Sequence, residues 1–228
     1  MPSDAPRQDR RQPWDDPRVV AGMERLLARR QELLAAGARS IGWKLAFGAE
    51  PMLEALGLRG PLVGFLTDAT VVESGAEVAV GDWSAPKLEP EIAIHLGPGG
   101  EGVAAIGPPI ELADVDRPPT EVAEVLAGDV FHRGVILGPP LARPPGPLAV
   151  TVERDGERFA ASADAEAAVG RLDSLAAYVS VYLARFGAAT REGEVIISGS
   201  TVPMIDVAAG QSWACRVEGV GELEVRLT

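Results

Sequence analysis

Glycine and proline make up about a fifth of this chain, with 26 glycines and 19 prolines among 228 residues. Average proteins contain roughly an eighth. In the middle of the chain these residues separate short runs of β-type residues, so long continuous elements are excluded there. The expected strands lie at 70–72, 77–80, 88–96, 134–137, 148–153, 158–162, 194–198, 212–217 and 222–227. The pair Asp155-Gly156 predicts a hairpin between two of them.

Two segments have helical periodicity instead. The first runs from Pro17 to Gly37, and the second runs from Asp164 to about Phe186. A shorter helical patch covers 50–56. Because the strands do not alternate regularly with helices, a doubly wound fold is disfavoured. We expect an α+β domain at 17–228, with a mostly antiparallel rolled or sandwiched sheet and two long flanking helices, preceded by a flexible arm at 1–16.

The charge balance excludes several classes of protein. The formal net charge is −12, which repels phosphate backbones and argues against a nucleic-acid partner. No apolar run is long enough to cross a membrane, and the first sixteen residues lack the apolar centre of a signal peptide. The one cysteine, Cys215, excludes an internal disulfide framework. A cytoplasmic protein without a membrane partner is expected.

The most informative segment is 87–96, which alternates as a strand does. One face carries Leu88, Pro90, Ile92, Ile94 and Leu96, and the other carries Lys87, Glu89, Glu91, Ala93 and His95. Glu89 and Glu91 therefore project to the same side, with Cα atoms roughly 6–7 Å apart. Two carboxylates this close repel each other unless a proton or a cation lies between them.

A hard divalent cation would relieve this repulsion, because Mg²⁺, Mn²⁺ and Ca²⁺ prefer oxygen ligands. The alternative interpretation is an ordinary solvated strand face on an acidic protein. A third ligand would favour the metal, and Glu111 lies in an apolar-flanked strand that could return beside the first. Asp114 and Asp116 are also candidates, and the pattern alone does not choose among the three.

Five motifs, in this order and approximate spacing, resemble the 2-keto-4-pentenoate hydratase branch of the fumarylacetoacetate hydrolase superfamily. They are IGWKL at 41–45, GFLTD at 64–68, LEPEIA at 88–93, VIISGS at 195–200 and GELEV at 221–225. The resemblance covers about residue 17 to the end. It implies a mixed β-roll fold, self-association into a homo-oligomer, and a divalent cation, with Mg²⁺ expected and Mn²⁺ or Ca²⁺ as alternatives.

The resemblance also implies site residues. The metal ligands would be Glu89, Glu91 and Glu111, and the substrate would be a small 2-oxo acid that chelates the metal. Lys44 would be the catalytic lysine, and a lysine buried near a cation should have a lowered pKa. Ser200, beside backbone N–H groups, is expected to bind the substrate carboxylate. For Lys44 the alternative is a structural ion pair, and for Ser200 it is a simple turn residue.

Three further residues lie in or near the segments that carry the site. His132, in the segment DVFHRG at 129–134, is larger than the family pattern and can bind a second carboxylate or act as an acid or base; a structural histidine is the alternative. Lys87 shares the face of Glu89, where it would balance charge and lie close to the substrate. His95 lies too far along the strand to share the ion and is expected to be structural.

Two departures from the family pattern limit the choice of reaction. Leu62 stands where hydratases of this branch carry an aspartate, and leucine cannot relay a proton. The stretch between Glu91 and Glu111 is shorter, with residues 97–102 predicted as a tight hairpin. We expect a metal-dependent hydratase acting on an unsaturated 2-oxo acid such as 2-hydroxypenta-2,4-dienoate, in the catabolism of aromatic compounds. The alternatives are a decarboxylase, a C–C hydrolase or a catalytically silent binding protein.

Overall fold

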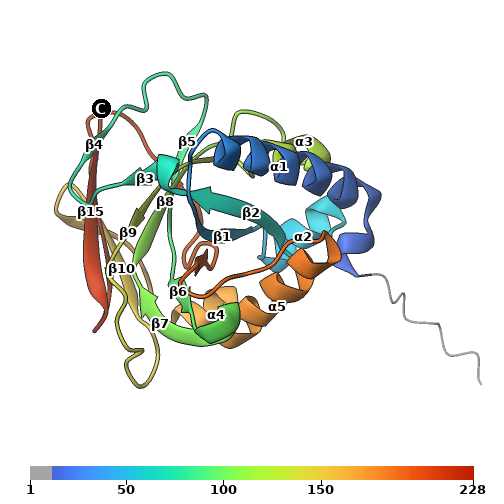
Figure 1. Cartoon of the computed structure of the whole chain (residues 1–228). Helices are drawn as coiled ribbons and strands as arrows, with labels where there is room; N and C mark the ends of the chain where they lie inside the picture. The colour runs from blue at the N-terminus through green and yellow to red at the C-terminus, as the bar shows by residue number, and fades with distance from the viewer. Residues whose placement is uncertain (1–11) are drawn as a thin grey trace, which may run out of the picture.

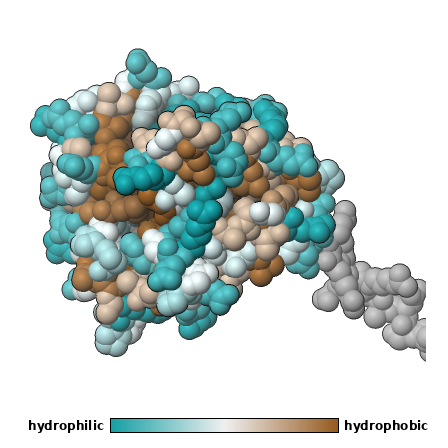
Figure 2. All heavy atoms as spheres, in the orientation of Figure 1, coloured by the Kyte–Doolittle hydropathy of each residue, from teal (hydrophilic) through white to brown (hydrophobic). Residues whose placement is uncertain are grey.

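The computed structural model describes residues 12–228, and within that range the short runs form three five-stranded sheets. Figure 1 shows the helices gathered on one side of the molecule, with the sheet that contains β4 and β15 on the opposite side. In the same orientation, the space-filling view shows apolar residues in patches among hydrophilic ones (Figure 2). No helix of the described residues is both long and apolar enough to cross a membrane.

The first sheet has the order β2-β1-β12-β6-β7. Its strands are β1 (Ser40–Ala46), β2 (Leu62–Thr67), β6 (Ala93–Leu96), β7 (Val103–Gly107) and β12 (Val195–Ile197). β1 pairs antiparallel with β2 and parallel with β12, with Gly42 opposite Val195. A Cβ atom at Gly42 would lie 1.8 Å from the Val195 carbonyl oxygen, so only glycine permits this close approach of the two backbones.

The second and third sheets pack face to face. The second, β11-β10-β14-β15-β4, comprises β4 (Glu77–Val78), β10 (Val150–Arg154), β11 (Glu157–Ser162), β14 (Ser212–Val217) and β15 (Gly221–Leu227). The third, β13-β5-β8-β9-β3, comprises β3 (Val71–Val72), β5 (Pro86–Pro90), β8 (Pro109–Asp114), β9 (His132–Leu137) and β13 (Ile205–Asp206). Leu88, Ile110 and Leu112 of the third sheet share one core with Trp213, Leu223 and Val225 of the second. The α+β class and the layered sheets are confirmed.

The helices cover the first sheet. α1 (Pro17–Ala35) and α2 (Glu50–Leu56) end near the predicted glycines, and α3 (Val122–Ala127), which the sequence did not predict, packs on α1. α1 contacts β2, whereas α5 (Leu172–Arg185) contacts β6 and β7. Short 3₁₀ turns lie at η1 (Pro13–Asp15), η2 (Asp68–Thr70) and η3 (Pro98–Gly100), the last within the predicted tight turn.

The prediction of one long second helix was wrong. The segment divides into α4 (Ala165–Val169) and α5, separated by Gly170 at φ +97° and by Arg171 in extended conformation. The predicted start of the helix at Asp164 was correct, since the Asp164 side chain accepts a hydrogen bond from the Glu166 N–H. A glycine in this backbone region ends a helix even where the apolar stripe continues beyond it.

Part of the predicted flexible arm is ordered. Residues 1–11 lie outside the described residues, but Trp14 packs against Tyr178 and Tyr182 with ring centroids 6.2 and 5.9 Å away. The Asp16 side chain accepts a hydrogen bond from the Arg18 N–H and so caps α1. The aromatic contact was not visible from composition, because Trp14 sits alone among polar residues.

The predicted continuous strand at 88–96 is two strands in two different sheets. β5 belongs to the third sheet and β6 to the first, and the chain crosses between them at Glu91 and Ile92. The apolar face is buried as predicted, with Leu88, Ile92 and Ile94 all fully inaccessible. The alternation of apolar and polar residues therefore predicted burial correctly. It did not indicate that the chain changes from one sheet to another at this point.

We expect Gly42→Ala to lower the free energy of unfolding by about 3 kcal/mol or more, because the clash is with backbone and no side-chain rotation relieves it. Denaturant unfolding measures this. Gly81→Ala is the matched control: its Cβ would meet no atom within 4 Å, and a change within about 0.5 kcal/mol is expected. Equal stability of the two variants would contradict the close approach of β1 and β12.

Candidate metal and substrate site

Two antiparallel strands bring the first two acidic residues together. β5 pairs with β8, and in this register Glu89 lies directly opposite Glu111. Opposite residues on such a pair have Cβ atoms about 4.5–5.5 Å apart. The return of the Glu111 strand beside β5, which the sequence predicted, is therefore confirmed, and Asp114 lies at the far end of the same register opposite Pro86.

The loop after β12 fastens the crossing between β5 and β6. The Ile92 N–H donates to the Ser198 hydroxyl at 3.0 Å, and the Thr201 N–H donates to the Pro90 carbonyl at 2.8 Å. The Gly199 N–H donates to Glu91 Oε2 at 2.8 Å. These contacts hold Glu91 beside Glu89 and Glu111, closer than it would lie on a continuous strand.

The three carboxylates form one cluster, in which one oxygen of each lies within 4.8 Å of the others. Glu91 and Glu111 are buried and Glu89 is half-buried. Burial, reinforced by the charge of Glu111, raises the pKa of Glu89 to about 7 and that of Glu91 well above its usual range. Burial is the larger cause of both shifts, and repulsion between the carboxylates adds to it.

Glu111 is the carboxylate with cationic neighbours. The Lys44 ammonium donates to Glu111 Oε1 and also to the Val130 carbonyl, 3.1 Å away. His132 Nδ1 lies 2.7 Å from the same Glu111 oxygen, and its Nε2 lies 2.9 Å from the Thr70 hydroxyl. Burial acts to raise the pKa of Glu111, but Lys44 and His132 outweigh it and hold that pKa below its usual value.

The carboxylates around Lys44 raise the pKa of its ammonium. Burial acts to lower it, but the charges of Glu111 and Asp129 raise it more. The lowered pKa expected from the sequence applies to a lysine beside a bound cation and stays a prediction. A buried lysine facing several acidic groups keeps its proton.

The donor set fits a hard divalent cation. Three carboxyl groups lie together and only Glu111 pairs with the lysine, so Glu89 and Glu91 lack a basic partner. Among the described residues, Glu91 Oε1 and Glu111 Oε2 are buried side-chain oxygens without a hydrogen-bond partner. A buried carboxylate oxygen left in this way is costly unless a cation or proton satisfies it. Oxygen ligands at these positions suit Mg²⁺, Mn²⁺ or Ca²⁺.

A strained turn next to the cluster was not predicted. Asp129, Val130 and Phe131 all have positive φ, between 48° and 66°, although none is glycine or asparagine. Such backbone costs about 1–3 kcal/mol per residue and persists where the surroundings impose it. The turn presents the Val130 carbonyl to Lys44, and Asp129 accepts the Phe65 N–H at 2.9 Å. Burial raises the pKa of Asp129 to about 6, against the opposing charges of His132 and Lys44.

A cavity of about 280 Å³ opens onto the cluster through Glu89. Its polar end also includes Ser198, Gly199 and Ser200, and the Ser200 hydroxyl is buried without a hydrogen-bond partner. Its other walls come from the end of β1 and the following loop, α2, α4, α5 and the strained turn. Leu62 is buried in the core beside this cavity, and the neighbouring Pro61 lines it.

The structure separates the other predicted site residues from the cavity. Lys44 and His132 lie behind Glu111 and do not line it, so their direct roles in proton transfer and substrate binding stay predictions. Lys87 pairs with Asp206 on β13 and is also absent from the cavity wall. Although Lys87 was predicted on the same strand face as Glu89, it does not line the cavity. His95 lies on β6 opposite Val195 and Ala105, away from the cluster as expected.

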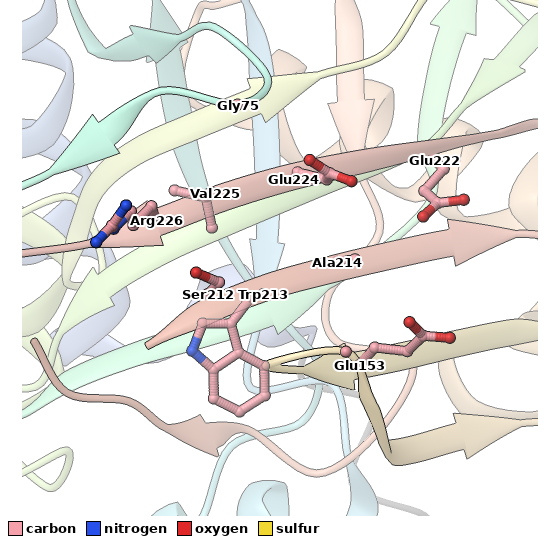
Figure 3. Close-up of a pocket in the computed structure, with 10 residues that line it drawn as sticks. Gly75, Glu153, Ser212, Trp213, Ala214, Glu222, Glu224, Val225 and Arg226 are labelled. Carbon is pink, nitrogen blue, oxygen red and sulfur yellow. The ribbon is translucent and has the colours of Figure 1, made fainter. Parts of the chain in front are cut away.

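A second concavity of about 350 Å³ lies on the sheet of β10, β14 and β15 (Figure 3). It also carries acidic residues, with Glu153 on β10 and both Glu222 and Glu224 on β15 (Figure 3). In the described part of the chain, only Glu89, Glu91 and Glu111 bring three ligand atoms together. Glu222 instead pairs with Arg216 at 2.6 Å. Substitutions of glutamates in this concavity are therefore suitable controls for substitutions in the cluster.

Comparisons with known proteins agree with the motifs. No family model matches the chain. A 2-hydroxyhexa-2,4-dienoate hydratase from Comamonas testosteroni is 29% identical, with 85% of this chain and 80% of the relative covered. A 4-oxalocrotonate decarboxylase from a Pseudomonas species is 25% identical, with 92% and 87% covered.

A solved structure shows the same fold. The 4-oxalocrotonate decarboxylase from Pseudomonas putida G7, complexed with magnesium and adipate, has a TM-score of 0.80 at 23% identity, with 92% of this chain and 86% of that chain covered. The same enzyme was also solved with calcium and acetate. The resemblance to this branch of the fumarylacetoacetate hydrolase superfamily and the predicted fold are confirmed.

The two lysines of the chain should differ in their contribution to stability. Lys44→Met leaves Glu111 buried without its ammonium partner and should lower the free energy of unfolding by about 3 kcal/mol. Lys87→Met should change it by less than about 0.5 kcal/mol, because its partner Asp206 is 86% exposed and solvent screens the pair. Urea titration of both variants in chelator-treated buffer tests this, and equal losses would contradict the placement of Lys44.

Proposed function

We propose that this protein is a divalent-cation-dependent hydratase of small unsaturated 2-oxo acids, of the kind that 2-hydroxypenta-2,4-dienoate represents. The observation that carries the proposal is the buried carboxylate cluster with two unpartnered oxygens, open through Glu89 to a cavity with a free serine hydroxyl. The hydratase and decarboxylase relatives support it, since both names describe enzymes that act on related unsaturated acids.

Glu89, Glu91 and Glu111 are proposed to hold the cation, with Mg²⁺ as the expected ion. The neighbour solved with magnesium and with calcium supports this choice of ion class. When bound, a divalent cation supplies Lewis-acid polarisation of the carboxylate and 2-oxo oxygens of the substrate.

The chain's own residues would perform the remaining tasks. The Ser200 hydroxyl, buried at the polar end of the cavity, would donate to the substrate carboxylate. Lys44 would keep the charge at Glu111 balanced by holding its proton against that carboxylate. The apolar walls would hold the unsaturated carbon chain and limit the access of bulk water to it.

Hydration is the expected outcome because the polarised 2-oxo group allows protonation of the far end of the dienol. The carbon next to that position then accepts water, so one water molecule adds across the substrate and no fragment leaves. Loss of the dienol absorbance in the ultraviolet, with one 4-hydroxy-2-oxo acid formed and no carbon dioxide released, would support the proposal. Cation-dependent release of carbon dioxide from oxaloacetate, assayed separately, would identify a decarboxylase instead, and no turnover of 2-hydroxypenta-2,4-dienoate would contradict the proposed hydratase.

Cation binding should stabilise the fold through the cluster alone. Added Mn²⁺ should raise the melting temperature of the wild-type protein, and the double variant Glu89→Gln with Glu91→Gln should lose this rise. The control double variant Glu222→Gln with Glu224→Gln removes two carboxylates from the other concavity and should keep it. If the cluster variant responded to Mn²⁺ as the wild type does, the assignment of these ligands would be wrong.

Ser200→Ala should separate binding from stability. The hydroxyl has no partner in the protein, so its removal should leave the free energy of unfolding within about 0.5 kcal/mol. Loss of a hydrogen bond to the substrate carboxylate should raise KM roughly 10- to 100-fold. Steady-state kinetics measures the KM, and urea unfolding measures the free energy of unfolding.

Ser198→Ala is the matched control for Ser200→Ala. The Ser198 hydroxyl accepts the Ile92 N–H and donates to the Gly199 carbonyl at 2.9 Å, so this variant should lose about 1–2 kcal/mol of stability. An unchanged KM in Ser200→Ala would remove Ser200 from substrate binding.

A further inference from the structure

The cavity has one polar end and otherwise apolar walls. Glu89 and the loop at Ser198–Ser200 form the polar end. The remaining side chains are aliphatic or aromatic, or are glycine and proline. They include Phe47, Met52, Phe131, Val169, Leu175 and Met204. A substrate held by its 2-oxo acid group at the polar end therefore places its carbon tail against apolar atoms.

No lining residue in the described part of the chain is Arg, Lys or His. The nearby basic groups are engaged elsewhere. Lys44 and His132 contact Glu111, and Arg133 pairs with Asp116 at 3.1 Å. Glu89 is the one charged side chain that lines the cavity within the described residues, and it is acidic.

We propose that this chain selects 2-oxo acids with an uncharged apolar tail and rejects the corresponding dicarboxylates. The inference rests on the proposed function and names the substrate class of the same site. A second carboxylate at the tail would lose its hydration and find no cation, which is a costly exchange. Each additional methylene in contact with the walls instead gains affinity, by about fourfold.

The aromatic part of the wall is held in place before any ligand arrives. Phe47 and Phe131 meet edge to face, with ring centroids 6.2 Å apart. Both residues have left-handed backbone, with φ of 58° and 66°, so their positions are imposed by the surrounding fold. A preformed apolar wall loses little side-chain entropy on binding and cannot easily rearrange to solvate a charge.

The matched ligands are 2-oxohexanoate and 2-oxoadipate, which have the same number of carbons and differ in the terminal carboxylate. Titration calorimetry of the Mn²⁺-loaded full chain should give at least 30-fold tighter binding of 2-oxohexanoate. Equal binding, or tighter binding of 2-oxoadipate, would overturn the inference. Pyruvate is the reference ligand without a tail. If pyruvate and both longer acids failed to bind, the proposed function would fall and the inference with it, whereas binding of pyruvate without the tail preference would overturn the inference alone.

A cation placed on the wall should weaken the selection. Met52→Arg and Met204→Arg, made separately, introduce a guanidinium at half-buried and 44% exposed positions of the lining. At least one should reduce the preference for 2-oxohexanoate tenfold or more, chiefly by tighter binding of 2-oxoadipate. Val181→Arg is the control, because Val181 is 55% exposed on α5 and does not line the cavity. An unchanged preference in both folded lining variants would contradict the proposed position of the tail.

Discussion

Three clustered carboxylates, two of them buried, around one buried lysine are the constraint on which the rest of this structure depends. Lys44 is paired with Glu111, and Glu89 and Glu91 remain with raised pKa values and little compensation. A fold that carries such a cluster is less stable than one with an apolar core at the same place, because each uncompensated charge resists burial. The cluster therefore supports the proposal that a cation binds here, and the cavity opens onto it through Glu89.

The architecture around the cluster uses unusual backbone to bring it together. The chain leaves one sheet at Pro90 and enters another at Ala93, and the loop at Ser198–Thr201 fastens this crossing with hydrogen bonds to both sides. On the opposite side, the left-handed turn at Asp129–Phe131 supplies a carbonyl to Lys44 and an aromatic wall to the cavity. Glu89 and Glu111 lie on paired strands, whereas Glu91 and the aromatic part of the wall are held by irregular segments.

Much of this could be predicted from the sequence, because local patterns determine local structure. Period-2 alternation identified the buried face of 88–96, and the glycine after Leu56 identified the end of α2. The motif order identified the fold and the third acidic residue. The crossing at Glu91 could not be predicted, since alternation reports burial and not which strand is the partner. The turn at Asp129 was missed because Val130 and Phe131, which follow Asp129, are residue types that rarely adopt positive φ. The placement of Lys87 depended on Asp206, which is distant in sequence and adjacent in space.

The most direct test of this account is a crystal structure of the full chain grown with Mn²⁺ and oxalate, with anomalous scattering to locate the ion. The account predicts one strong anomalous peak within about 2.0–2.6 Å of oxygens from Glu89, Glu91 and Glu111. Oxalate should complete the coordination and extend toward Ser200. An ion bound elsewhere, for example among Glu153, Glu222 and Glu224, or a cluster without an ion at saturating Mn²⁺, would contradict it.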